Sequence, residues 1–320
     1  PRGHPSFSKK LAKDISNLML MCDKHHRLID KEQVAEHPVK RLTRMKALHE
    51  ARIELVTSIH PNMRSEVLMY GANIGAQDAP VSYRSAVEAM LPKRYPASAN
   101  GISLGLKNSG IVDRDKDFWK FEEQHLRRQF TEHIKPRLFD KSVEHLSIFA
   151  FAPQPLLILL GALLSDIPAA DVYQRHREPV GWAWKNSPQK FNYSIEQPKS
   201  KLGPPALVLA LSATITNDRI ASVLNSPSIW RVTIPAPNND FLKSKQQLQQ
   251  FREVMRPLLD RIKASHGKKA TIHVFPAAPV SINVELGRIL MPKADLPLRI
   301  YDQNKGAFSP AMDINAGGRS

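Results

Sequence analysis

Phe151-Ala-Pro-Gln-Pro155-Leu-Leu-Ile-Leu-Leu-Gly161 returns in altered form as Phe275-Pro-Ala-Ala-Pro279-Val-Ser-Ile-Asn-Val-Glu-Leu-Gly287. Each copy has the pattern of a strand end, a turn stiffened by prolines and an apolar helix that contains Leu-Gly. A second strand then follows, with a tyrosine 12 residues after the glycine in the first copy and 14 in the second. The repeat indicates two related strand–helix–strand units, although two unrelated units would also give this pattern.

Outside the repeat, strand and helix patterns alternate along the chain. Strands are predicted at Val67–Asn73, Leu146–Ala152, Phe191–Glu196, Ala206–Ser212, Ile229–Ile234, Thr271–Phe275 and Leu298–Tyr301. Helices are predicted at Pro38–Ile59, Asp113–Ile134, Pro155–Leu164, Lys243–Ser265 and Val280–Leu290. This alternation predicts an α/β fold with a mostly parallel sheet covered on both faces. The repeat divides it into two Rossmann-like halves that face each other.

The two proline turns are the first candidates for a ligand site. Open α/β sheets bind ligands in the crevice at the carboxyl ends of their strands, and both Pro153 and Pro276-Ala277 stand at such ends. The helix after each turn can direct its positive N-terminus at a phosphate. Gln154 is the only polar side chain in either turn, so it is the first candidate for a base or ribose contact. The alternative is that both turns only pack the sheet edge.

Four further side chains are candidates for the same site. Gln174 and Asp302 stand at the ends of the matching second strands, and Arg175 follows Gln174. Their polar groups can read a base or a phosphate, or simply finish a strand. Trp184 alternates with Trp182 along a predicted strand, which leaves stacking on a base and packing in a core both open.

Composition limits the class of protein. The chain has 320 residues, of which 42% are hydrophobic and 24% charged, as is typical of globular proteins. A single cysteine excludes an internal disulfide framework and favours a reducing cytoplasm. The longest apolar stretch, residues 148–164, contains prolines near its middle and is too short for a membrane span. We therefore expect a soluble cytoplasmic protein.

The charge of the chain points to a polyanionic partner. The formal net charge is +16, and nucleic acid is the simplest partner for it. Residues 1–64 carry 13 Lys and Arg against 7 Asp and Glu, together with 6 of the 12 histidines. Basic charge with histidine suggests metal chemistry on a polyanion. A solvated basic face would explain the same composition.

A short motif near the start of the chain carries that chemistry. Asn17 is followed by Cys22-Asp-Lys-His25-His26 and then by Asp30. This segment resembles the second half of an HNH (ββα-metal) nuclease motif. The resemblance implies that Asn17 holds the loop, that Cys22 and His25 form half of a structural zinc site, and that His26 binds a catalytic Mg²⁺ or similar ion. The first histidine of the motif and its β-hairpin are not present, so residues 1–60 would be the C-terminal part of such a domain with a connecting helix.

Residues 61–320 resemble the SAVED domain of anti-phage signalling systems. The resemblance rests on these segments: Phe149–Gly161, Val172–Pro179, Gly181–Trp184, Leu209–Ile215, Asn238–Phe241, Val274–Pro279 and Glu285–Lys293. It implies two fused CARF-like halves that sense a cyclic oligonucleotide. HNH followed by SAVED resembles the bacterial HNH–SAVED effectors of CBASS, the cyclic-oligonucleotide-based antiphage signalling system.

This resemblance gives the functional hypothesis. A cyclic oligonucleotide, such as the cyclic dinucleotide 3′,2′-cGAMP, would bind the C-terminal domain, and the subunits would rearrange as a homodimer or homotetramer. Paired HNH sites would then cut double-stranded DNA. Two alternatives remain open at this point. One is a nucleotide sensor or scaffold without chemistry, and the other is a nuclease that needs no ligand.

Overall fold

The computed structural model describes residues 8–74, 81–105, 115, 117–185, 191–304 and 306–315. The chain divides into two compact units, Pro1–Asn62 and Met63–Ser320. The division predicted from the sequence, after residue 60, falls two residues earlier. Each unit is described by itself below.

The first unit contains helices and connecting turns, and no strand, among its described residues. It contains α1 (Ser8–Leu11), a 3₁₀ turn, α2 (Asp23–Arg27), a π-helical turn at Leu28–Glu32 and α3 (Val39–Thr57). Helix α3 is slightly shorter than the helix predicted at Pro38–Ile59, because Pro38 is its N-cap and it ends at Thr57. Within residues 10–62 only Ile29 and His37 are buried. This unit therefore lacks a hydrophobic core of its own among the residues described.

The second unit contains two sheets that are parallel except at the edges of the second. In the first sheet β1 pairs with β2, β3 and β4, and β4 pairs with β5, always in parallel. The second sheet has the order β11-β10-β9-β7-β8-β6, in which only the edge strands β11 and β6 are antiparallel to their neighbours. The strands are β1 (Arg64–Gly71), β2 (Tyr95–Pro96), β3 (Ile102–Leu104), β4 (His145–Phe151), β5 (Ala169–Tyr173), β6 (Ser194–Glu196), β7 (Pro205–Ala210), β8 (Ser228–Thr233), β9 (Ile272–Ala277), β10 (Leu298–Asn304) and β11 (Ala307–Ile314). The sheets confirm the α/β class and divide the repeat between them.

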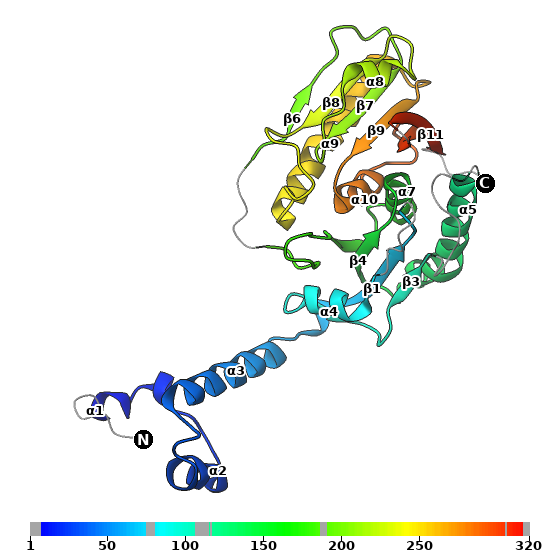
Figure 1. The fold of residues 1–320 in the computed structure, drawn as a ribbon. Helices are drawn as coiled ribbons and strands as arrows, with labels where there is room; N and C mark the ends of the chain where they lie inside the picture. Colours follow the sequence, from blue (N-terminus) through cyan, green and yellow to red (C-terminus); the bar gives the residue numbers. More distant parts are fainter. Residues whose placement is uncertain are drawn as a thin grey trace. The chain divides into compact units, whose positions relative to one another are not determined.

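Two of the helices lie between the sheets, as Figure 1 shows. They are the helices of the repeat, α7 and α10, and their side chains join one continuous core with those of both sheets. The outer helices include α5, which buries Phe118 and Leu126 but leaves Phe121 40% exposed. The helices of this unit are α4 (Tyr83–Met90), α5 (Phe118–Gln129), α6 (Lys135–Phe139), α7 (Gln154–Leu164), α8 (Asn217–Ala221), α9 (Lys245–His266) and α10 (Val280–Arg288).

The Leu-Gly of each repeat is where α7 and α10 touch. A Cβ on Gly161 would lie 2.0 Å from the Val284 carbonyl oxygen, and a Cβ on Gly287 would lie 2.0 Å from that of Ile158. Only glycine allows two backbones to approach this closely. Both copies keep the glycine because each helix uses it against the other.

Candidate functional site

The helices α7 and α10 run in the same direction and begin at the same edge of the unit. The first residue of α7 and the turn before α10 are joined by a hydrogen bond from the Ala278 backbone N–H to Gln154 Oε1 at 2.9 Å. Pro153 and Pro279 are the two N-caps, with φ angles of −53° and −57°. The strands β4 and β9 end directly before these turns, so the two helix N-termini and the two strand ends form one edge. This is the edge at which open parallel sheets bind ligands.

Gln154 bridges the two halves. Besides Ala278, its Oε1 accepts from the Asn283 side-chain amide at 3.1 Å. The oxygen thus holds the turn before α10, and a side chain of α10, from the other half. Its amide Nε2 has no partner among the described residues, and the side chain is half-buried. Gln154 can therefore present a hydrogen-bond donor to a ligand while its oxygen stays engaged.

Gln174 is also used between the halves, and more completely. Its side chain is buried, and its Oε1 accepts from the Ser281 backbone N–H at 3.3 Å and from the Ser281 hydroxyl at 2.7 Å. Its amide Nε2 donates to the Arg175 carbonyl at 2.7 Å. Gln174 therefore binds the first turn of α10 and Gln154 binds the turn before it, an arrangement that the sequence did not predict.

The other predicted ligand residues do not all lie at this edge. Pro153 and Pro276 are buried, and the half-buried Ala277 accepts two backbone hydrogen bonds, from Leu211 at 3.0 Å and Ser212 at 2.7 Å. Asp302 is half-buried on β10, opposite Ser309 of β11. The turns are thus held rigidly at the ends of β4 and β9, whereas Asp302 belongs to the outer part of the second sheet.

Arg175 and Trp184 belong to the loop that follows β5. The Arg175 guanidinium lies 5.4 Å from the ring centre of Trp182, which is buried against Phe149 and Tyr173. Trp184 is half-buried and meets the His176 ring edge to face at 5.9 Å. Neither tryptophan lies in a strand, contrary to the sequence prediction, and Trp182 is a core residue.

His176 follows Arg175 and is a buried polar group. Neither of its ring nitrogens has a hydrogen-bond partner within the part of the chain described, and the same holds for Trp184 Nε1. Burial, followed by the charges of Lys243 and Lys185, lowers the pKa of His176 to about 4. The imidazole is therefore neutral at physiological pH, beside the end of β5.

The C-terminal ends of the two helices are joined by Arg288, which is also buried. It donates from Nε to the Ser165 carbonyl at 3.1 Å and from Nη2 to the Pro168 carbonyl at 3.0 Å, both just after α7. Its Nη1 lies 3.2 Å from Glu285 Oε1, and Glu285 also pairs with Arg252. Glu285 and Arg288 are each only 4% exposed, so their ion pair is buried. The sequence signal for this joining role is the presence of polar residues inside an otherwise apolar helix.

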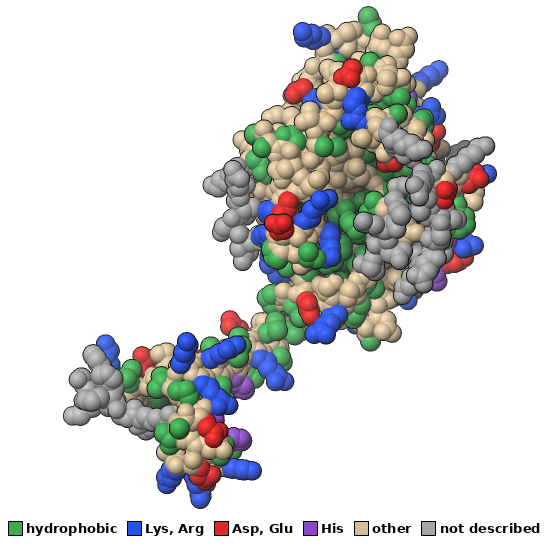
Figure 2. Space-filling view, viewed as in Figure 1, with side chains coloured by type: hydrophobic (Ala, Val, Ile, Leu, Met, Phe, Trp, Pro, Cys, Tyr) green, Lys and Arg blue, Asp and Glu red, His purple; other side chains and the backbone are tan. Residues whose placement is uncertain are grey.

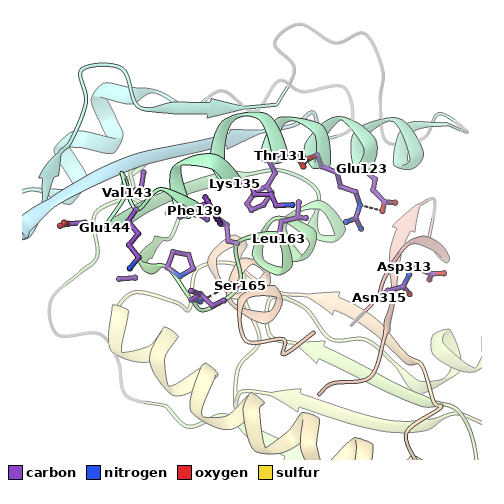
Figure 3. Close-up of a pocket in the computed structure, with 18 residues that line it drawn as sticks. Glu123, Thr131, Lys135, Phe139, Val143, Glu144, Leu163, Ser165, Asp313 and Asn315 are labelled. Atoms are coloured by element: carbon purple, nitrogen blue, oxygen red, sulfur yellow. Dashed lines mark hydrogen bonds and ion pairs between the residues drawn. The ribbon is translucent and has the colours of Figure 1, made fainter. Parts of the chain in front are cut away.

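A hollow of about 1240 Å³ lies at the other end of α7. It is lined by α5, α6, the end of α7 and the start of β5. Figure 3 shows Thr131, Lys135 and Phe139 beside Leu163 and Ser165, with Asp313 and Asn315 set apart from them. Because this hollow adjoins the beginnings of the strands, it is separate from the edge at which the helices start.

The predicted metal segment of the first unit is exposed. Cys22 is the N-cap of α2, and its Sγ lies 3.0 Å from His25 Nδ1. Hydrogen bonds from His25, the backbone one first, lower the pKa of the Cys22 thiol. His26 Nε2 lies 3.3 Å from Asp30 Oδ2, and the Asn17 amide donates to the Leu11 carbonyl at 3.2 Å. Among the residues described, no group of three or more His, Cys, Asp or Glu side chains converges as a metal site.

The sequence matches the family described as the SMODS-associated and fused to various effectors sensor domain, SAVED, over residues 126–314. The match includes more than half of the chain, and the chain belongs to this family. The matched range contains the repeat, both glycines and all the contacts between α7 and α10 described above.

Solved structures show the same fold. The Cap4 SAVED/CARF-domain containing receptor of Acinetobacter baumannii with the cyclic trinucleotide 3'3'3'-cAAA has a TM-score of 0.51 and 13% identity, over 79% of this chain and 52% of that one. The same receptor with 2'3'3'-cAAA has a TM-score of 0.51 and 14% identity, over 97% and 66%. This chain therefore spans about half to two thirds of those receptors. A search of curated proteins found no match. Among the described residues, no helix is long and apolar enough to cross a membrane.

Proposed function

We propose that this chain senses a cyclic oligonucleotide at the edge where α7 and α10 begin. The observation that carries the proposal is the pairing of two parallel helix N-termini, one from each related half, over the ends of β4 and β9. Helix N-termini favour phosphate, and two of them suit a ring with more than one phosphate. Membership of a sensor family supports this, as does the fold of receptors that were solved with cyclic trinucleotides.

The messenger that we favour is a cyclic dinucleotide such as 3′,2′-cGAMP. Such a molecule has two phosphates and two bases in a roughly two-fold ring, which suits two related halves. Gln154 Nε2 is the donor we assign to a base or ribose, because its oxygen is already engaged. The trinucleotides of the Cap4 structures are the main competitors. Calorimetric titration with a panel of cyclic di- and trinucleotides tests the proposal, and no binding by any member of the panel would contradict it.

We further propose that messenger binding activates an HNH nuclease that degrades double-stranded DNA, as part of CBASS. The support is the Asn17, Cys22, His25 and His26 set on a basic segment. The lowered pKa of the exposed Cys22 thiol favours the thiolate, the form that binds zinc. His26 would hold a catalytic Mg²⁺ beside Asp30, which already contacts it. The active protein would be a homodimer or homotetramer.

Plasmid DNA, Mg²⁺ and the messenger test this second proposal in the full-length protein. We expect His26→Ala to abolish cleavage and leave messenger affinity unchanged, because His26 belongs to the other compact unit. Cys22→Ala should lower the zinc content and unfold the small unit, since metal binding and folding are linked there. Binding of the messenger without any cleavage by the wild type would instead favour a sensor or scaffold. Cleavage that needs no messenger would favour a constitutive nuclease.

A further inference from the structure

Four neighbouring strands of the second sheet begin at the same edge, which lies opposite to the proposed messenger site. The strands β10, β9, β7 and β8 are parallel neighbours in that order. The loops that lead into them are residues 289–297, 267–271, 197–204 and 222–227. We call this surface the lysine edge, because its loops carry five exposed lysines: Lys199, Lys201, Lys268, Lys269 and Lys293.

Contacts bring the lysine-bearing loops together around the last turns of α9. The Lys201 Nζ lies 5.7 Å from the ring centre of the buried Trp230, whose Nε1 donates to His266 Nε2 at 3.2 Å. The loop with two consecutive lysines begins directly after His266. Lys263, one turn earlier in α9, donates to the Ala294 carbonyl in the loop before β10. The five lysines are therefore neighbours in space as well as in the order of the strands.

Few negative charges lie near the lysine edge. The four loops contain one acidic residue, Asp295, and its carboxylate is bound by Arg256. Glu196 and Asp313, on the flanking strands β6 and β11, each pair with an arginine of the neighbouring strand. Figure 2 shows that other Lys and Arg side chains of this unit often have an acidic side chain close by. Among the described residues the five lysines have no ion pair, so their charge is available to a partner.

A row of cations of this size matches the backbone of duplex DNA. Neighbouring strands lie about 4.8 Å apart, so the three lysine-bearing loops span about 10 Å. Duplex DNA carries one negative charge for about every 1.7 Å of its axis, and it therefore presents several phosphates over that length. A lipid surface fits less well, because the large apolar side chains exposed in the described loops of this edge are Leu202 and Met291 alone.

We propose that the lysine edge binds the phosphate backbone of duplex DNA without reading its sequence. Contacts from lysine to phosphate supply this kind of affinity. The edge lies at the start of β9, and the proposed messenger site lies at its other end, about 20 Å away along six residues. DNA and messenger can therefore be bound at the same time. The proposal concerns binding alone, so it holds whether or not the first unit cuts DNA and whichever messenger binds.

Fluorescence anisotropy of a short labelled DNA duplex tests the proposal. The full-length protein is used with EDTA and without messenger, so neither cleavage nor activation affects the result. We expect the double variant Lys201→Glu/Lys268→Glu to raise the Kd for DNA at least about tenfold, and to reduce the slope of log Kd against log salt by about two. The matched control is Lys93→Glu/Lys120→Glu, which changes the net charge equally at exposed positions of the first half and should bind DNA nearly as the wild type does.

Acetylation footprinting by mass spectrometry locates the contact. DNA should protect the five lysines of the edge and not the two control lysines, even if the first unit also binds DNA. Equal losses of affinity in the two double variants would overturn the proposal, because DNA would then respond to net charge alone. Absence of protection at the edge would overturn it as well. So would loss of binding to phosphatidylserine vesicles in Lys201→Glu/Lys268→Glu with unchanged binding of DNA, which would make the edge a lipid-binding surface.

Discussion

The two halves of the second unit share their packing but differ in their polar groups. Gly161 and Gly287 occupy equivalent positions, and each allows the other helix to approach. The turns are not equivalent, because Gln154, which follows the first N-cap, corresponds to Val280 after the second. Helix α7 is apolar apart from Gln154, whereas α10 buries Ser281, Asn283, Glu285 and Arg288. The glycines that both copies share therefore make the contact between the helices. The polar side chains that only one copy has make the hydrogen bonds that join the two halves.

This difference makes the candidate site asymmetric. Gln174 accepts from the first turn of α10 and Gln154 accepts from the turn before it, and both glutamines belong to the first half. Among the described residues, no side chain of the second half accepts a hydrogen bond from the backbone at the start of α7. A ligand at this edge therefore meets two unlike helix starts, although the backbone around them is related by a repeat. The predictions below test first the shared packing and then the unshared polar groups.

The largest effect is expected where the halves are alike. Gly161→Ala or Gly287→Ala places a methyl group within 2.0 Å of a backbone carbonyl, which cannot move aside as a side chain would. We expect each to lower the free energy of unfolding of the second unit by more than about 4 kcal/mol. Gly181→Ala is the matched control, because a Cβ there meets nothing within 4 Å. Urea denaturation measures all three. A loss under about 1 kcal/mol at Gly161 would mean that the helices do not cross at the glycines.

A smaller effect is expected at Arg288, which belongs to one half only. Arg288→Met removes the donors to Ser165 and Pro168 and leaves Glu285 buried with Arg252 alone. Breaking a buried ion pair from one side costs about 3 kcal/mol or more. Arg299→Met removes an exposed pair with Asp313 and should cost at most about 1 kcal/mol. Equal losses for the two variants in urea denaturation would show that Arg288 does not hold the halves together.

Sequence patterns identified the central elements of this fold well. The strand predicted at Leu146–Ala152 is β4 at His145–Phe151, and the helix predicted at Val280–Leu290 is α10 at Val280–Arg288. Long apolar runs bounded by prolines determine such elements locally. Short or peripheral elements such as α4, α8 and β11 were not predicted. The edge strand β11 contains Pro310, which an edge position tolerates and a sequence pattern does not favour.

The candidate site was predictable only in part. The proline turns do stand at one edge, but the bonds from Gln154 and Gln174 to α10 join residues 124 and 107 positions apart. Such contacts depend on how two halves dock, which periodicity does not encode. Gln154 was expected to be free for a ligand, and its oxygen was found bonded to the other half. The metal segment near Cys22 and His26 stays a prediction.

The third prediction separates the two roles of Gln154. Gln154→Ala leaves the Ala278 N–H without its acceptor, which costs about 1–3 kcal/mol of stability, whereas the Asn283 amide keeps the Ala278 and Pro279 carbonyls. Gln154→Glu keeps an acceptor oxygen, removes the Nε2 donor and adds a negative charge. We expect near wild-type stability for Gln154→Glu, but about a tenfold or greater loss of messenger affinity in both variants. Calorimetry and thermal unfolding measure the two effects. Unchanged affinity in Gln154→Glu would leave Gln154 with a structural role alone.

The smallest effect depends on pH and originates in the first half. Burial is the main cause that lowers the pKa of His176, to about 4, and it also lowers that of His145, which faces Asp171, Arg94 and Lys245. In the unfolded chain both would titrate near 6.5. Above that pH both histidines are neutral in the folded and in the unfolded protein, so they do not make the free energy of unfolding depend on pH.

Between about pH 6.5 and 4 the unfolded chain takes up protons that the folded protein refuses, so the free energy of unfolding falls as the pH falls. Below about pH 4 the folded His176 is protonated too, and its contribution to the slope ends. His176→Phe removes the titrating group, so its melting temperature should fall several degrees less than that of the wild type between pH 7 and pH 4.5. His133→Phe, at an exposed position on the same half, should follow the wild type. If His176→Phe and the wild type lose the same number of degrees, His176 is not the group that makes this half sensitive to acid.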